Sequence, residues 1–492
     1  MLQYMAPLMF AGLVVFLLVG YPVAFSLCFT GLAFGLLGIE LGMLQPALLQ
    51  ALPERVLGIM GNSTLLAIPF FTLMGLILER SGMAEELLDT IGQVFGAVRG
   101  GIAYAVVFVG ALLAATTGVV AASVLAMGLI SLPVMMRYGY SNRLSTGVIA
   151  ASGTLAQIIP PSLVLIVLAD QMGVSVGDMY EGALFPGLGL AAAYAVWVFI
   201  VSIVKPQAAP GCPPEMRTLR GAKLLGRVLT SMIPPLVLIF LVLGTIFIGV
   251  ATPTEGGAMG ATGALLMALV KRRLSWSLLK QAVESTATMT SFVMFILVGS
   301  TVFSLVFRGM DGDLWVERLL IGVPGGALGF LIVVNVMIFL LAFFLDYFEI
   351  AFIMVPLLTP VAQKLGIDLI WFGVLLAVNM QTSFLHPPFG FALFYLRSVA
   401  PRSVKTSDIY WGAIPFVAIQ VLMVAVVIAF PGFVTSNVTE ASTVKGTGAE
   451  ELQRQLQGIE PAAPPTGKPP ASAEEKSDDA TSEIERALKQ EK

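Results

Sequence analysis

Two pairs of adjacent prolines, each inside a long apolar stretch, limit the folds open to this chain more than any other feature. Pro160-Pro161 interrupts the apolar run 152–169, and Pro387-Pro388 interrupts the run 379–398. A proline removes a backbone donor and clashes with the preceding turn, so each apolar helix must break at its proline pair. Inside a membrane, a broken helix is tolerated only where its freed backbone groups line a cavity or find buried partners. The two breaks therefore predict a buried polar site.

The composition indicates a polytopic membrane protein. Of the 492 residues, 57% are hydrophobic and only 12% are charged, whereas typical soluble domains carry roughly 25% charged residues. Apolar stretches long enough to span a bilayer recur from the N-terminus to about residue 430. The stretches 5–20 and 22–38, separated by Gly20-Tyr21-Pro22, could form one kinked helix or two short helices, and a further helix is expected at about 57–79. The first of these stretches has no basic residue before Arg55, so we interpret it as a membrane helix and not as a secretory signal. A net charge of −3 gives no basic face for nucleic acid, and two cysteines and one histidine argue against a disulfide framework or a histidine metal site.

The two proline pairs are 227 residues apart, and other features repeat at the same offset. Gly82 and Gly309 begin two amphipathic segments that are expected to lie along the membrane interface. Pro133 and Pro360 lie near the ends of two interrupted apolar segments, the first of them interrupted at 116–123, and both segments are predicted to form re-entrant hairpins. We expect two repeats, residues 1–227 and 228–434, with hairpins at about 101–136 and 328–362 and broken helices at about 144–170 and 369–396.

These repeats predict an all-α polytopic membrane protein with two inverted repeats, each of about five transmembrane helices plus one re-entrant hairpin. An odd number of spans inverts the second repeat across the bilayer, which is the architecture of many secondary transporters. Basic loops, including 205–227 and Lys271–Arg273, fall on one side if both termini are periplasmic. The polar tail 435–492 is rich in Pro, Ala, Ser, Glu and Lys and is expected to be disordered.

The polar residues beside the breaks are the candidate ligands. Half-helix N-termini favour anionic groups, and unwound carbonyls can bind sodium. Asp346 lies in an otherwise almost uncharged apolar run, and a carboxylate at membrane depth is functional by default, so a cation-ligand role is favoured. Sodium ligands are expected among Thr117, Gly118, Ser152, Gly153, Pro160, Asp346, Asn379, Thr382 and Pro387. Substrate contacts are expected from Thr116, Ser123, Gln157, Ser162, Gln381 and Ser383.

Each of these assignments has a structural alternative. The small residues of the first hairpin tip also suit helix packing, and Asp346 and Glu349 could reach interfacial water. Glu255 follows Thr252-Pro253 at an expected helix start, where a structural role is favoured. His386 could line the site, relay protons or pack. The chain has no GxxxxGK[ST] loop, so direct ATP coupling is not expected.

With these residues laid out, the chain resembles the large membrane subunit of tripartite ATP-independent periplasmic (TRAP) transporters over about residues 5–432. The motifs that carry the resemblance are PFFTLMGLILERSGMAEEL (69–87), GTLAQIIPPS (153–162), GVATPTEGGA (249–258), FLDYFEIAFIMVPLLTPV (344–361) and NMQTSFLHPPFGFALFYLR (379–397). The last two look most like the mannitol, chloroaromatic or 2-oxo-acid branch. The resemblance implies an elevator-type ion-transporter-like fold in the bacterial inner membrane and sodium as the coupling ion. It also implies a small four-helix membrane subunit and a periplasmic receptor that delivers an organic acid.

Two other function classes stay open from the sequence. One is a receptor-independent sodium- or proton-coupled anion transporter with a related two-hairpin architecture. The other is a non-transporting scaffold or a channel in which the breaks line a pore. An enzyme is the least favoured class, because no nucleophile–base pair or metal cluster is evident.

Overall fold

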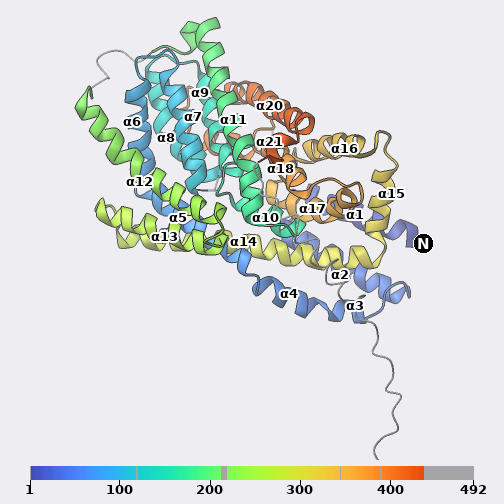
Figure 1. Cartoon of the computed structure of the whole chain (residues 1–492). Helices are drawn as coiled ribbons and strands as arrows, with labels where there is room; N and C mark the ends of the chain where they lie inside the picture. Colours follow the sequence, from blue (N-terminus) through green and yellow to red (C-terminus); the bar gives the residue numbers. More distant parts are fainter. Residues whose placement is uncertain (1, 118–119, 212–218, 344, 388–389, 437–492) are drawn as a thin grey trace, which may run out of the picture. The chain divides into compact units, whose positions relative to one another are not determined.

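The computed structural model describes residues 2–117, 120–211, 219–343, 345–387 and 390–436. Within these residues the regular elements are helices (Figure 1). Seven helices are long and apolar enough to cross a membrane, or eight if one bent pair forms a single span. The expected all-helical membrane fold is therefore confirmed, whereas the tail beyond residue 436 and Gly118 lie outside the described residues.

The first part of the chain contains helices that begin and end close to the expected positions. Their bounds are α1 (Leu2–Val19), α2 (Val23–Glu40), α3 (Ala47–Gln50), α4 (Leu52–Met60), η1 (Ser63–Leu66), α5 (Ala67–Arg80), α6 (Met83–Phe95), α7 (Gly101–Thr117), α8 (Val120–Arg137), α9 (Asn142–Thr154), η2 (Leu155–Gln157), α10 (Leu163–Met172), α11 (Val176–Val204) and η3 (Pro206–Ala208).

The second part follows the same order of helices. Their bounds are α12 (Ala222–Phe247), α13 (Pro253–Val270), α14 (Trp276–Gly309), α15 (Gly312–Ile321), α16 (Gly326–Leu341), α17 (Tyr347–Lys364), α18 (Leu369–Met380), η5 (Gln381–Phe384), α19 (Phe391–Val399), α20 (Thr406–Ala429) and α21 (Gly432–Thr435).

The helix bounds repeat at the offset seen in the sequence. Moving α9 forward by 227 residues gives 369–381, and α18 runs from Leu369 to Met380. Moving α10 forward in the same way gives 390–399, and α19 runs from Phe391 to Val399. Each half therefore contains one helix that breaks, passes through a 3₁₀ turn and resumes. The boundary after residue 227 stays a prediction, and it falls inside α12 (Ala222–Phe247), so a boundary before Ala222 would keep that helix whole.

The first two helices form an antiparallel pair, which settles a point that the sequence left open. The chain turns at Gly20-Tyr21-Pro22, and the ring of Phe16 in α1 packs edge-on against Phe29 in α2, with centroids 5.1 Å apart. The helix α2 then packs along the C-terminal half of α14, the long yellow helix that runs above α2, α3 and α4 in Figure 1. Gly31 makes this approach possible, since a Cβ atom there would lie 3.0 Å from the backbone nitrogen of Phe303.

Two expected elements differ from the structure, and a third, the second amphipathic segment, is present as a helix that meets the next one at a sharp bend. The helix expected at about 57–79 is divided into α4, η1 and α5, because the chain turns at Gly61 and the Asn62 side chain accepts a hydrogen bond from the Thr64 amide at 2.9 Å. The first hairpin was expected to be interrupted over 116–123, but α7 continues to Thr117 and α8 resumes at Val120. The second amphipathic segment, α15, meets α16 at a bend of 114°, which is visible in Figure 1.

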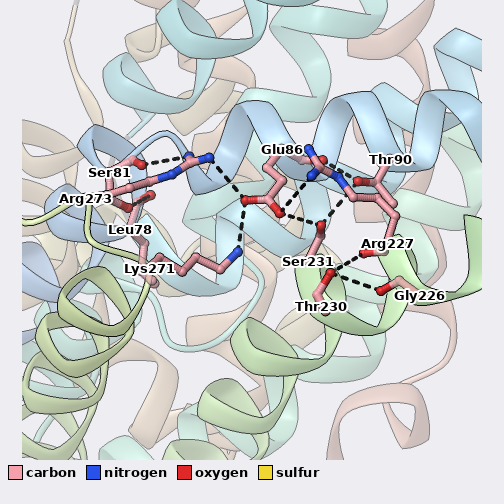
Figure 2. A network of polar contacts seen from close by, with 10 residues as sticks. All are labelled: Leu78, Ser81, Glu86, Thr90, Gly226, Arg227, Thr230, Ser231, Lys271 and Arg273. Atoms are coloured by element: carbon pink, nitrogen blue, oxygen red, sulfur yellow. Dashed lines mark hydrogen bonds and ion pairs between the residues drawn. The ribbon is translucent and has the colours of Figure 1, made fainter. Parts of the chain in front are cut away.

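The carboxylate of Glu86 in the amphipathic helix α6 forms hydrogen bonds and ion pairs with the second half of the chain. Glu86 accepts hydrogen bonds from Lys271 at 2.9 Å and from the Ser231 hydroxyl at 2.8 Å, and it forms ion pairs with Arg273 and Arg227 (Figure 2). Its side chain is only 10% exposed. The opposite face of α6 buries Leu87, Leu88 and Ile91, among other apolar residues. The expected amphipathic helix is thus present, and its polar face is anchored to α12 and to the loop after α13.

Candidate functional site

The two helix breaks meet in the interior of the bundle. The 3₁₀ turn η2 follows α9, and the 3₁₀ turn η5 follows α18. Between these breaks, Gln381 Nε2 donates a hydrogen bond to Thr154 Oγ1 at 3.0 Å, and both residues are fully buried. The structure therefore brings together the polar groups that the sequence placed beside each proline pair.

Four of the expected ligands carry a buried oxygen atom that has no hydrogen-bond partner among the described residues. They are Ser152 Oγ and Gln157 Oε1 at the first break and Gln381 Oε1 and Ser383 Oγ at the second. Each of these residues is at most 3% exposed. Buried polar atoms are nearly always paired in folded proteins. Unpartnered buried oxygens also occur elsewhere in the described residues, for example at Thr30 and Ser145, so a ligand role for the four at the breaks stays a prediction.

Other expected ligands already have partners that shape the breaks. The Ser162 hydroxyl donates to the Gln157 carbonyl at 2.7 Å and holds the unwound segment before α10. The Thr382 hydroxyl donates to the Asn379 carbonyl, also at 2.7 Å. Because these hydroxyls already donate their hydrogen within the breaks, only the lone pairs of their oxygen atoms are left to accept a hydrogen bond or to bind a cation.

Asn335 is a buried polar residue that the sequence interpretation missed. It lies in α16, where Asn379 Nδ2 donates to its backbone oxygen at 2.8 Å and to its side-chain oxygen at 2.9 Å. These bonds join the outer helix of the second hairpin to the second broken helix. A signal was present, since Asn335 is the single polar side chain of α16.

The first hairpin packs against the first broken helix through glycines. A Cβ atom at Gly153 would collide with the Val124 side chain of α8, and one at Gly110 of α7 would lie 2.5 Å from the Ser152 Cβ atom. Ser123 is buried in the first turns of α8. Thr116 and Thr117 end α7, but their side chains lie outside the described residues, as Gly118 does entirely. Contacts between this tip and an ion therefore stay a prediction.

The prolines themselves face less polar surroundings. Pro160 lines an apolar cavity of about 690 Å³ between α7, α11 and α12. Pro387 is half-buried and precedes the two residues that lie outside the described part of the chain. The Pro160 ring thus faces an apolar cavity and not the polar groups at the breaks.

Asp346 and Glu349 form a reciprocal cap at the start of α17. Asp346 Oδ1 accepts from the Glu349 amide, and Glu349 Oε2 accepts from the Asp346 amide, both at 2.8 Å. Such a capping box satisfies two amides that a helix start would otherwise leave unpaired. Asp346 therefore has a structural role in capping α17. Its expected role as a cation ligand stays a prediction, and it would use the carboxylate lone pairs that do not accept a hydrogen bond in the cap.

Thr252 and Glu255 form the corresponding box at the start of α13. Glu255 Oε2 accepts from the Thr252 amide at 2.8 Å, and the Thr252 hydroxyl accepts from the Glu255 amide at 3.3 Å. This is the structural role that the sequence favoured for Glu255.

His386 packs as an aromatic side chain at the second break. Its ring stacks on Phe343 and meets Phe339 edge-on, with both centroid distances at 4.3 Å, and it is only 2% exposed. Within the described residues there is no cluster of three or more His, Cys, Asp or Glu side chains that could hold a metal ion. A cation at the breaks would therefore depend on hydroxyl, amide and backbone oxygens, which suit a hard monovalent ion.

The sequence matches the family described as "Tripartite ATP-independent periplasmic transporter, DctM component" over residues 10–433. One relative is the C4-dicarboxylate TRAP transporter large permease protein DctM of Pseudomonas aeruginosa, which is 30% identical over 79% of this chain and 89% of its own length. Another is the sialic acid TRAP transporter large permease protein SiaM of Vibrio cholerae, which is 27% identical over 85% of this chain and 94% of its own length.

The fold is similar to that of a solved transporter with little sequence identity. The YdaH transporter of Alcanivorax borkumensis superimposes with a TM-score of 0.54 at 16% identity, covering 80% of this chain and 90% of that one. This likeness concerns the fold alone.

Proposed function

Since this chain belongs to the DctM component family of tripartite ATP-independent periplasmic transporters, we propose that it is the large permease subunit of a sodium-driven transporter that imports an organic acid. The family is one of membrane transport and not of catalysis. The observation that carries the finer proposal is the set of unpartnered buried oxygens at the two breaks, contributed by Ser152, Gln157, Gln381 and Ser383.

Sodium suits this arrangement for a chemical reason. Hard cations take oxygen ligands, and unwound backbone in transporters supplies carbonyls for coupling ions. The breaks combine free side-chain oxygens with backbone that leaves its helical pattern between Gln157 and Leu163. Occupation by sodium would satisfy groups that otherwise cost free energy when buried without partners.

The proposed substrate is a carboxylate such as a 2-oxo acid or lactate. Relatives are named for C4-dicarboxylate, sialic acid, isethionate and 2,3-diketo-L-gulonate transport, all of which are organic anions. The relative DctMQ of Oleidesulfovibrio alaskensis is named as a permease for isethionate, and this chain covers 65% of its length. As partners we propose a small four-helix membrane subunit and a periplasmic receptor that brings the substrate to the permease.

The proposed movement is of the elevator type. The hairpins α7–α8 and α16–α17, with the two broken helices, would move as a unit against a scaffold that includes α2, α5, α13 and α14. Both termini would be periplasmic, which puts the loop Lys271–Arg273 in the cytoplasm of the bacterial cell. Bound sodium would order the breaks and offset the negative charge of the substrate while the site crosses the hydrocarbon.

The direct test is uptake into proteoliposomes that contain this chain and its small subunit, with the receptor added outside. We expect accumulation of a radiolabelled carboxylate that requires both an inward sodium gradient and the receptor. Uptake that persists without the receptor would favour the receptor-independent alternative. Substrate efflux without counterflow would favour a channel, and uptake driven equally well by potassium would overturn the sodium proposal.

A further inference from the structure

A polar crevice lies away from the helix breaks, between four helical elements. Its volume is about 360 Å³. One wall is formed by α4, which contributes Arg55, and by Asn62, which caps η1. Another wall is the C-terminal half of α14, with Ser304 and Arg308. The end of α10 and Pro356 of α17 complete it.

The polar residues of α14 recur at helical spacing. Ser300, Ser304 and Arg308 are four residues apart, so they form one stripe along the face that meets the crevice. The Ser300 hydroxyl donates to the Phe352 carbonyl at 2.6 Å and thereby joins α14 to α17 at the bottom of the stripe. The α14 side of the crevice is thus a polar stripe that ends at Arg308.

The charge in the crevice is predominantly positive. Within the described residues, neither the Arg55 nor the Arg308 guanidinium has an ion-pair partner. Among the described residues that line the crevice, Asp170 is the one acid. Its two oxygens already accept from Asn62 Nδ2 at 2.6 Å and Gln171 Nε2 at 3.1 Å. Two guanidinium groups therefore remain for an anion from outside the chain.

We propose that this crevice is a binding site for a small organic carboxylate, held by Arg55 and Arg308 and completed by the Ser304 hydroxyl. A guanidinium presents a planar fork of donors that matches a carboxylate. The crevice could hold on the order of ten water molecules, at about 30 Å³ for each, so an acid of a few carbon atoms fits and a large glycoside does not. Hydroxyls and amides line the crevice beside a few apolar side chains, among them Leu65 and Leu297, which suits the polar ends and the short carbon chain of such an acid.

The position of the crevice suggests an entry site. The helix α14 begins at Trp276, close to the basic loop Lys271–Arg273, and ends at Gly309, so Arg308 lies at the opposite end of the span. Under the proposed function that opposite end is periplasmic, which is where a receptor would release its acid. The Asn62–Asp170 hydrogen bond joins the crevice to α10, the second half of the first broken helix. The role in entry rests on the proposed function, whereas the anion site itself does not.

Cysteine accessibility tests the site without sodium, receptor or transport. Ser304→Cys would be placed in a Cys28→Ser, Cys212→Ser background of the full chain, in detergent. The rate at which the introduced cysteine reacts would be measured with an anionic and with a cationic methanethiosulfonate of similar size. Each rate would be divided by the rate of the same reagent with a free thiol in solution. We expect the anionic reagent to react about tenfold faster, because fixed positive charge concentrates anions in a cleft. Arg308→Gln should remove most of that preference, and succinate should slow the reaction whereas its uncharged diamide should not.

The matched control is Arg318→Gln in the same background. Arg318 lies in α15, is exposed and bonds only locally, Nε to the Leu314 carbonyl at 3.2 Å, so its removal should leave the preference unchanged. Equal normalised rates for the two reagents would overturn the proposal, as would equal protection by succinate and its diamide. A Cys at 304 that reacts with neither reagent, while Arg318→Cys reacts with both, would show a crevice closed to water and would also overturn it. Because no transport is measured, a chain that proved not to use sodium would leave these results intact.

Discussion

Gln381 and Thr154, which share a hydrogen bond of 3.0 Å, are equivalent residues of the two repeats, since they are 227 residues apart. A residue can contact its own repeat mate only where the pseudo-twofold axis passes between them. The axis that relates the two halves therefore runs through the contact between the two helix breaks. The same axis explains why α18 packs on α11 and, in the other half, α9 packs on α20.

We expect Thr154→Val to destabilise the contact at this axis. Valine keeps the shape of threonine but leaves Gln381 Nε2 buried without its acceptor, which costs about 1–3 kcal/mol. Thermal unfolding in detergent would measure the change in stability. The single variants Thr154→Val and Gln381→Met and the double variant together form a double-mutant cycle. We expect a coupling of about 0.5–3 kcal/mol between the two positions. Strict additivity would mean that the hydrogen bond contributes nothing to the folded state.

A second prediction separates ligand groups from packing groups. Within the described residues the Ser383 hydroxyl is buried without a partner, whereas the Ser398 hydroxyl in α19 donates to the Tyr395 carbonyl at 2.7 Å and is exposed. We expect Ser383→Ala to raise the sodium concentration for half-maximal uptake by about tenfold, equivalent to one lost ligand interaction of about 1.4 kcal/mol.

Ser398→Ala should leave the sodium dependence unchanged and serves as the matched control. Thermal stability gives the second readout, because removing a hydroxyl that bonds nothing should not destabilise the protein. A Ser383→Ala variant with a normal sodium response and unchanged or higher stability would remove Ser383 from the site.

The Glu86 cluster predicts a pH-dependent stability. Partial burial acts to raise the pKa of Glu86, but the hydrogen bonds from Lys271 and Ser231 and the charges of Lys271 and Arg227 outweigh it and hold the pKa below the ordinary 4.5. A depressed pKa means that the folded state favours the ionised form. The stabilisation is therefore complete above pH 4.5 and is lost as the pH falls through the lowered folded-state value.

We expect Glu86→Gln to lower the free energy of unfolding by about 2 kcal/mol at pH 7, because hydrogen bonds to charged groups are worth about 1.5–3 kcal/mol. The difference from the native chain should shrink as the pH falls below 4.5. Glu85, which is exposed on the same helix, supplies the control variant Glu85→Gln. A constant difference between pH 7 and pH 4 would contradict a role for the Glu86 charge.

Close helix approach predicts a severe packing defect at Gly147. A Cβ atom there would collide with the backbone oxygen of Gly412, where α9 packs against α20. We expect Gly147→Val to cost more than about 3 kcal/mol, since overpacking a tight contact forces backbone shifts. Gly226 in α12 has open space around it, so Gly226→Ala is the control. Retained yield and melting temperature for Gly147→Val, measured after purification in detergent, would show that α9 and α20 can separate without cost.

The sequence predicted most reliably what local chemistry decides. Both breaks lie at proline pairs, but Pro234-Pro235 lies inside the continuous helix α12, so it was the repeated spacing that singled out the two pairs at the breaks. Asn62 was missed as a helix boundary, because a cap followed by a 3₁₀ turn lacks the strong signal of a proline. Asn335 was missed as a site residue, because its importance comes from Asn379, which is 44 residues away in sequence. Contacts between distant segments, unlike breaks, leave little trace in the local pattern.

Asp346 offers the sharpest separation of structure from ion binding. Its Oδ1 atom caps α17 by accepting from the Glu349 amide, and asparagine is as good an N-cap as aspartate. Asp346→Asn should therefore keep the cap, the membrane insertion and the melting temperature while it weakens or abolishes sodium-dependent uptake. Asp346→Ala should lose the cap as well and should destabilise the protein by about 1 kcal/mol. Normal sodium stimulation in the Asn variant would limit Asp346 to its structural task at the start of α17.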